Sequence, residues 1–230
     1  MSETRRPAVL VLSTLHQFHP EVSGYGFAAL RHLLEMIEPD AIFAEVTAGD
    51  LASRGEEGVK REYSESVYPF LKDFPMVRAH PLEPSGALRD TLICSQRRAM
   101  AQAKESPDYA VLESFVQSWL TVLLSSFRTA QDVNSKETDA AVMAKKEYEG
   151  RFYPVEYTNV WMEWNQHFYD RIVETVCHEK PRLSVVLVGL EHSYWLRAKL
   201  AACGDIDMLD VHSELERLDA ASFIKPSDRV

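Results

Sequence analysis

Two almost entirely apolar runs, AVLVLS at residues 8–13 and SVVLVG at residues 184–189, limit the folds open to this chain most strongly. Neither run alternates apolar with polar residues, which indicates strands that are covered on both faces. Such strands are typical of parallel sheets, in which crossover helices lie on both sides. We therefore expect an α/β fold with a mostly parallel central sheet flanked by helices.

Further strand-like runs support this order of elements. They are AIFAEV (41–46), MVRAH (76–80) and a weaker DMLDV (207–211). Between the first two strands, FAALRHLLEMIEPD places its leucines and Ile37 on one helical face, and Pro39 ends the pattern. This alternation predicts β-α-β units with right-handed crossovers.

The middle of the chain departs from that alternation. Residues 85–178 contain several helical patterns and no convincing strand, so we expect one domain, residues 1–230, with residues 85–178 as an inserted helical lobe. The clearest pattern spaces apolar residues three and four apart from Leu112 to Phe127, which predicts either core or the seam of a homodimer. Residues 132–154 are polar and charged, which predicts a solvated helix and a loop.

Charge and cysteine content argue against several classes of protein. The formal net charge is -10 and no Lys/Arg cluster forms a basic groove, so we do not expect nucleic acid as a partner. The three cysteines are scattered without CxxC spacing, which disfavours a disulfide framework and a thiolate zinc site and fits a reducing cytoplasm. The apolar runs are too short for a signal peptide or a membrane span. We expect a cytoplasmic protein with no membrane partner.

Side chains that bind metals follow each strand-like run. In an open parallel sheet, ligands bind beyond the carboxyl ends of the strands, where such side chains would share one edge. Imidazoles and carboxylates are good ligands for a borderline divalent ion. In strand order, the residues at this edge are His16 and His19, Glu45, His80, Glu191 with His192, and His212.

His16, Glu45 and His192 are the strongest candidates. His16 and His192 directly follow buried runs, where each either acts in the site or bonds to a backbone carbonyl. A carboxylate at the end of AIFAEV is costly to bury unless a cation or metal pairs with it, which favours a functional Glu45. His19 is a candidate substrate contact, although its place before Pro20 favours an exposed turn.

A second group of candidates lies on the helix predicted within residues 157–176. Tryptophans and aliphatic residues form its packed face, while His167 and Arg171 lie one turn apart on another. Arg171 could bind a substrate carboxylate or phosphate with two hydrogen bonds. The alternative is a surface pair with Glu163 or Glu174.

Well-known catalytic motifs are not found. The sequence contains neither GxGxxG after a strand nor GxxxxGK[ST], HExxH or GxSxG. A classical nucleotide-binding fold, a zincin and a serine hydrolase are therefore disfavoured.

The ordered motifs STLHQFHPE, EPDAIFAEV and VVLVGLEH resemble the superfamily of Tiki metalloproteases, TraB/PrgY proteins, erythromycin esterases and ChaN haem-binding lipoproteins. Those proteins carry GxxH after the first strand, a glutamate that closes a strand, and a second GxxH after a late strand. GLEH ending at His192 matches the late motif and Glu45 the middle one, whereas STLH has Ser13 where the family prefers glycine. Arg171 is similar to an arginine upstream of the late strand.

The resemblance implies an α/β fold in which His16, Glu45 and His192 face one cleft. Its members suggest a metal-dependent hydrolase, peptidase-like or esterase-like, acting on a small-molecule or peptide substrate. These three residues would hold a divalent ion and its water, with Glu45 either ligating the ion or taking a proton. Arg171 would orient an anionic group or the oxyanion, with His167 and His19 as further substrate contacts. The alternative is a non-catalytic protein that binds haem or a small molecule, or a regulatory protein, with the same cleft.

Overall fold

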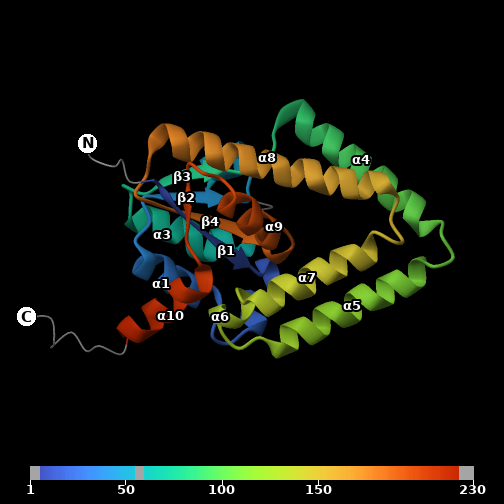
Figure 1. Ribbon diagram of the computed structural model, residues 1–230, viewed down its shortest axis with the longest axis horizontal. Coiled ribbons are helices and arrows are strands. Elements are labelled where there is room, and N and C mark those ends of the chain that lie inside the picture. Colours follow the sequence, from blue (N-terminus) through green and yellow to red (C-terminus); the bar gives the residue numbers. More distant parts are fainter. Residues whose placement is uncertain (1–5, 55–59, 223–230) are drawn as a thin grey trace, which may run out of the picture.

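Five parallel strands form one sheet in the order β3-β2-β4-β1-β5 in the computed structural model, which describes residues 6–54 and 60–222 (Figure 1). The expected α/β fold with a parallel sheet is confirmed. The strands are β1 (Ala8–Thr14), β2 (Ala41–Ala44), β3 (Arg78–Pro81), β4 (Leu183–Gly189) and β5 (Asp207–Met208).

The helices connect these strands and cover the sheet. They are α1 (Phe27–Ile37), α2 (Ala48–Ser53), α3 (Tyr68–Asp73), α4 (Gly86–Lys104), α5 (Tyr109–Ser126), α6 (Ala130–Val133), α7 (Lys136–Glu149), α8 (Val155–Glu179), α9 (Leu190–Ala201) and α10 (Val211–Ser222). A 3-10 helix, η1 (His16–Glu21), follows β1, and a π-helix, η2 (Tyr63–Val67), precedes α3.

Both faces of the sheet are buried, as the apolar runs predict. Leu10 and Leu12 of β1 pack in one cluster with α1, η2, α3 and α10. Their neighbours Val9 and Val11 point to the opposite face and pack with α8 and α9. Alternate residues of one strand thus supply two cores, which explains why β1 has no polar alternation.

Two strands end earlier than the sequence indicates. β2 stops at Ala44, so Glu45 and Val46 lie just beyond the sheet, and β5 has only two residues. Glu45 therefore belongs to the loop at the carboxyl edge, where its side chain can turn toward neighbouring strands.

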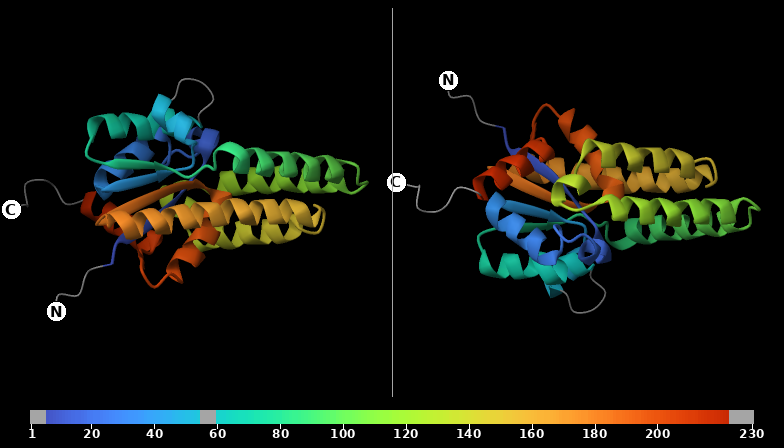
Figure 2. Two further views of the ribbon diagram at one scale, coloured as in Figure 1. Left: turned by 90° about the horizontal axis from the view of Figure 1, so that it is seen from above. Right: turned by 90° about the horizontal axis from the view of Figure 1, so that it is seen from below.

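Four long helices, α4, α5, α7 and the first half of α8, extend past the carboxyl ends of the strands (Figures 1 and 2). α8 packs along α4 there, and its second half packs on the sheet through Phe168, Ile172 and Val176. The helical segment expected over residues 85–178 is thus joined to the sheet by one continuous helix. Among the described residues, no helix is long and apolar enough to cross a membrane.

α7 is solvated on one side only, whereas its charged sequence predicts a solvated helix. Lys145 and Glu149 lie buried on its inner side, beside Val142. The two charges are tolerated because they pair with each other at 2.9 Å, and Lys145 also pairs with Glu191 at the start of α9. The buried side was not predicted because sequence alone does not show that a charged residue has a partner from another helix.

Candidate functional site

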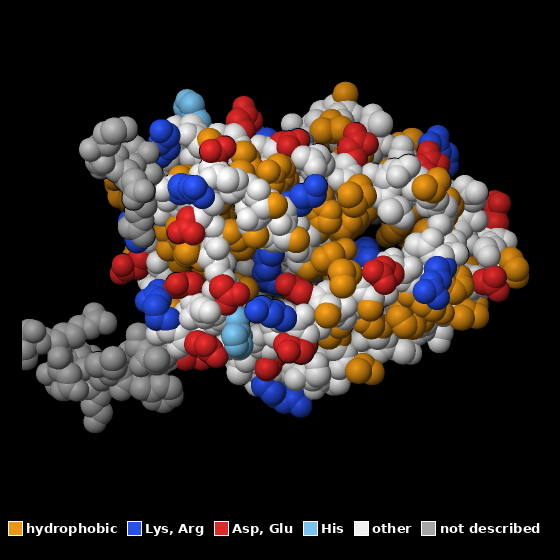
Figure 3. All heavy atoms as spheres, in the orientation of Figure 1, with side chains coloured by type: hydrophobic (Ala, Val, Ile, Leu, Met, Phe, Trp, Pro, Cys, Tyr) orange, Lys and Arg blue, Asp and Glu red, His pale blue; other side chains and the backbone are white. Residues whose placement is uncertain are grey.

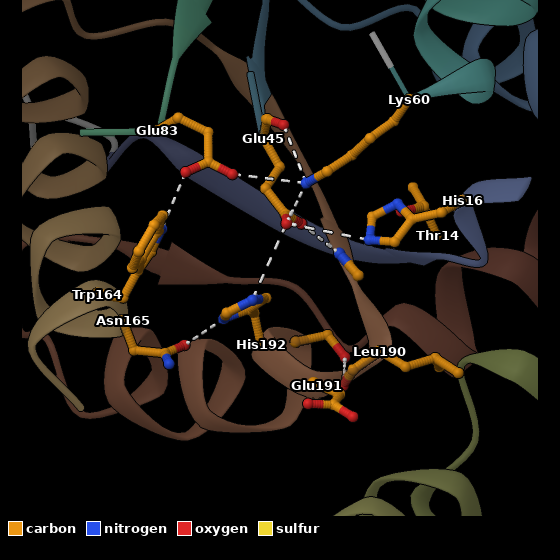
Figure 4. Close-up of polar contacts among 12 residues, drawn as sticks. Thr14, His16, Glu45, Lys60, Glu83, Trp164, Asn165, Leu190, Glu191 and His192 are labelled. Atoms are coloured by element: carbon orange, nitrogen blue, oxygen red, sulfur yellow. Dashed lines mark hydrogen bonds and ion pairs between the residues drawn. The ribbon is translucent and has the colours of Figure 1, made fainter. Parts of the chain in front are cut away.

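The register of the sheet brings three predicted residues together. Thr14 of β1 lies opposite Gly189 of β4, and Ala44 of β2 lies opposite Leu187, so β2 ends two residues before β1 and β4, and Glu45 continues from it toward their ends. Beyond these strand ends, the side chains of His16, Glu45 and His192 point toward one another (Figure 4). His16 Nε2 and His192 Nε2 each lie 3.9 Å from Glu45 Oε1.

Glu45 lies at the centre of this site. It is 5% exposed, and its Oε2 accepts a hydrogen bond of 2.6 Å from the backbone N–H of Gly189. Its Oε1 pairs with the ammonium group of Lys60, which also donates to the Glu45 carbonyl at 3.2 Å. Burial alone would raise the pKa of Glu45, but Lys60, together with His192 and His16, lowers it to about 2. The carboxylate is therefore ionised at neutral pH.

His16 is oriented by a buried glutamate. Its Nδ1 lies 2.5 Å from Oε1 of Glu62, a side chain with no exposed surface, and Thr14 Oγ1 donates to the same oxygen at 3.3 Å. A carboxylate only accepts hydrogen bonds, so the Nδ1 proton faces Glu62. Nε2 is then the ring atom that faces Glu45 and the adjoining cavity.

His192 has a parallel arrangement on the other side of Glu45. Asn165 of α8 donates from Nδ2 to the Trp161 carbonyl at 2.7 Å, which turns its Oδ1 toward His192 Nδ1 at 3.1 Å. With the proton on Nδ1, the Nε2 lone pair points to the site. Burial lowers the pKa of His192 and outweighs the opposite effect of Glu45, so this ring is neutral at neutral pH.

Gly189 makes room for His16. A Cβ at this position would lie 2.6 Å from His16 Nε2 and 3.6 Å from Glu45 Oε2. Any larger residue would push the imidazole out of place. The glycine of GLEH is therefore required by the close approach of a ring from another strand.

Lys60, Glu62 and Glu83 complete the site, although their sequence context does not indicate it. Lys60 Nζ lies 3.5 Å from Glu83 Oε1, and Glu83 Oε2 accepts a hydrogen bond of 3.0 Å from Trp164 Nε1. Nothing in the charged stretch KREYSES (60–66) distinguishes Lys60 and Glu62 from the residues of a surface helix, and Glu83 lies in the loop-like PLEPSG. Asn165 had a detectable signal, since it falls on the apolar face of α8 between Trp161 and Phe168.

Two cavities meet at this site. One, of about 270 Å³, is bordered by His16 and Gly189 on the site side and by α5 on the other. The second, of about 200 Å³, includes Glu45 and Glu83 and is walled by α8. His192 and Glu191 line both. Figure 3 shows a hollow between α8 and α7, where a third cavity of about 430 Å³ adjoins the second.

Other predicted residues lie elsewhere. His19 is buried, not in an exposed turn: Nδ1 bonds to the Tyr25 carbonyl at 2.6 Å, and Nε2 accepts from the Leu15 N–H at 3.1 Å. These bonds leave neither nitrogen for a substrate. The expectation of an exposed turn failed because the chain after Pro20 folds back over the ring.

Arg171 and His167 are not brought to Glu45. Arg171 is 42% exposed and pairs with Glu174 at 3.6 Å, the surface alternative considered above. His167 lies one turn before it on α8, and burial lowers its pKa. Both therefore stay only predictions as substrate contacts. Of the weaker candidates, His80 stacks on Phe43, and His212 pairs with Glu216 on the surface.

The residue types at the site are suitable ligands for a divalent ion, but their arrangement is not. Two imidazoles and a carboxylate are a common ligand set, and a bond to an acceptor at Nδ1 is typical of metal-binding histidines. However, the oxygen that both rings approach is already paired with Lys60. Within the described residues, no group of three or more His, Cys, Asp or Glu side chains is arranged to hold a metal. An ion at Glu45 Oε1 requires Lys60 to withdraw.

Comparison with family models, with curated proteins and with solved structures finds no match to this chain, so the superfamily resemblance stays a prediction based on its motifs.

Proposed function

We propose that this chain is a hydrolase of esters or amides in which His16 takes a proton from the attacking water. The observation that carries this proposal is the 2.5 Å contact between His16 Nδ1 and Glu62, which leaves Nε2 directed into the site. A carboxylate that fixes the tautomer of a histidine base is a recurring arrangement in hydrolases.

The neighbouring groups have supporting roles in this proposal. His192 Nε2 accepts a hydrogen bond from the same water and so positions it between the two rings. His16 takes one proton, the hydroxide attacks the carbonyl carbon, and the protonated ring returns that proton to the leaving group. Glu45 holds Lys60 and the Gly189 N–H in place. Lys60 and the positive end of α9 favour the negative charge that develops on the carbonyl oxygen.

His16→Ala tests the proposal. Hydrolysis of p-nitrophenyl acetate and of short peptides is measured for the wild type, His16→Ala and His212→Ala, the last being an exposed histidine outside the site. Loss of a general base lowers kcat by about 10²- to 10⁴-fold, and His212→Ala keeps the wild-type rate. Equal rates in the wild type and His16→Ala would contradict the role of His16.

The metal-dependent hydrolase is a second candidate, favoured by the Nδ1 bonds of both histidines. His16, Glu45 and His192 would hold the ion, whose chemistry is to acidify a bound water. Metal content is measured after native purification for the wild type, for Lys60→Ala and for His16→Ala combined with His192→Ala. Metal in the first two and none in the third supports this candidate, whereas equal, negligible metal in all three leaves His16 as the base.

A protein that binds haem or a small molecule without turnover is the remaining prediction. The aromatic rings beside the site, among them Trp161 stacked 6.5 Å from His192, could line such a pocket. Titration with haem followed by absorbance separates this case, because ligation by a histidine shifts the spectrum. No shift, together with ester turnover, favours the hydrolase.

A further inference from the structure

The cavities on the two sides of α9 differ in chemistry. The cavity next to His16 is bounded mainly by apolar side chains of η1, α5 and α9 and by Leu15. The cavity next to Glu45 is bounded by carboxylates, an amide and the indole of Trp164. A ligand that extends across His192 therefore meets an apolar wall at one end and hydrogen-bonding groups at the other.

We propose that the substrate is an ester or amide with a small apolar acyl group, held beside α5, and a larger polar leaving group, held beside α8. This inference rests on the proposed hydrolase function and names its substrate class.

The acyl side is assigned by the position of His16. The imidazole and Gly189 both line the apolar cavity, so the carbon that water attacks lies at its mouth. Six of the other lining residues are apolar and favour an apolar occupant, because burying such a group against them removes it from water. They are Leu15, Phe18, Trp119, Leu120, Leu124 and Leu190. Thr14, Glu191 and His192 are the other polar residues of the lining.

The wall of this cavity is held firmly. Lys145 Nζ lies 5.3 Å from the centre of the Trp119 ring, and the same ammonium pairs with Glu149 and Glu191. Lys145 is 4% exposed, so this cation–π contact is largely desolvated. The indole is thereby fixed across the cavity, and the length of the acyl group is limited.

The leaving-group side is more open. Lys146, Tyr157 and Trp161 line both the polar cavity and the adjoining cavity of about 430 Å³. A leaving group can therefore extend from Glu83 past Trp161 toward Arg151. The site limits the acyl group more strictly than the leaving group.

Leu120→Trp, which fills the apolar cavity, tests this assignment. The ratio of kcat/KM for p-nitrophenyl butyrate to that for p-nitrophenyl acetate is measured in the wild type and in variants. Each buried methylene favours the longer ester by about fourfold, so the wild-type ratio is well above one. Leu120→Trp lowers the ratio to one or below. Val122→Trp is the matched control, because Val122 is 67% exposed on the same helix, and it keeps the wild-type ratio.

A second variant guards against misfolding of the first. Trp119→Ala enlarges the cavity, so kcat/KM for p-nitrophenyl octanoate rises relative to that for the shorter esters in this variant. If the ratios for Leu120→Trp and Trp119→Ala both equal that of the wild type, the assignment of the acyl group is overturned.

A binding measurement separates this inference from the proposed function. Acetamide, butyramide and hexanamide are titrated calorimetrically into wild type and Leu120→Trp. If affinity rises with chain length in the wild type alone and no ester is turned over, the assignment of the apolar cavity stands and the proposed hydrolase function is overturned. Turnover combined with no effect of chain length on either rate or binding overturns the cavity assignment and keeps the hydrolase.

Discussion

His16 has a backbone φ of 50°, in the left-handed region that few residues other than glycine adopt. Such a conformation costs on the order of 1–3 kcal/mol and persists where the surroundings enforce it. Here the strand before it and the bond to Glu62 fix both the backbone and the ring. Glu38, Arg54 and Lys180 have the same φ as helix C-caps, whereas His16 adopts it just after a strand and beside Glu62.

Gly189→Ala tests how closely His16 must approach β4. The new Cβ would lie 2.6 Å from His16 Nε2, so the ring must move away from Glu45. We expect ester hydrolysis to fall by about 10²-fold or more, since a base must lie within hydrogen-bond reach of its water. Gly49→Ala is the control, because its Cβ meets only Thr47 Oγ1 at 3.7 Å. Unchanged hydrolysis in Gly189→Ala contradicts a role for the His16 ring at this place.

Glu191 makes stability depend on pH. Burial alone would raise its pKa, but Lys146 and Lys145 lower it to about 2, from 4.5 in the unfolded chain. Because the folded-state pKa is the lower one, this contribution to stability is complete above about pH 4.5 and is lost as the pH falls toward 2.

We expect the difference in Tm between wild type and Glu191→Gln to be largest near neutral pH and to shrink between about pH 4.5 and 2. Thermal unfolding at a series of pH values measures it. The acid sensitivity due to Glu45 is common to both proteins and cancels in the difference. A difference that is constant over this range would show that Glu191 is not held in its ionised form.

At the scale of elements, Arg197 joins α9 to β1 and to the helices after α5. Its guanidinium donates to the Val11 carbonyl at 3.2 Å, to Asn134 Oδ1 at 2.7 Å and to Asp139 at 2.6 Å. It also donates to the hydroxyl of Ser13, which stands where the resembling family prefers glycine. A serine fits here because its hydroxyl has partners in the buried space.

Arg197→Leu should lower the free energy of unfolding by about 2–3 kcal/mol, because it leaves buried acceptors without a donor. Urea unfolding followed by circular dichroism measures this loss. Arg217→Leu, which removes an exposed pair with Glu214, should cost less than about 1 kcal/mol. Similar losses in the two variants would show that the Arg197 bonds add little.

The sequence predicted those elements whose own residues are apolar enough to indicate that they are buried. β1 and β4 were visible as apolar runs, and the residues directly after them, His16 and His192, could be placed at the edge of the sheet. Lys60 and Glu62 could not be found, because their places in the site come from ion pairs with Glu45 and His16, which are distant in the sequence, and not from local pattern. The same reason explains the misjudged α7, whose charges are paired from α9.

At the scale of the whole molecule, the homodimer expected from the apolar stripe stays a prediction. Of the stripe, α5 buries Leu112 and Leu124 and leaves Leu123 partly exposed. Light scattering over a range of concentrations should give a mass above 26.2 kDa that Leu123→Glu returns to that of one chain. A single-chain mass for wild type at every concentration contradicts the dimer.

The strand order has a consequence for synthesis of the protein. β1 lies between β4 and β5, and both of these strands come far later in the sequence, with Ala8 opposite Leu183 and Asp207. At about 5–20 residues per second, a nascent chain carries the apolar β1 for on the order of ten seconds or more before either neighbour is translated. During that interval the strand is a binding site for chaperones and a risk for aggregation. Translation of β4, and not early compaction, therefore sets when His16 and His192 first meet.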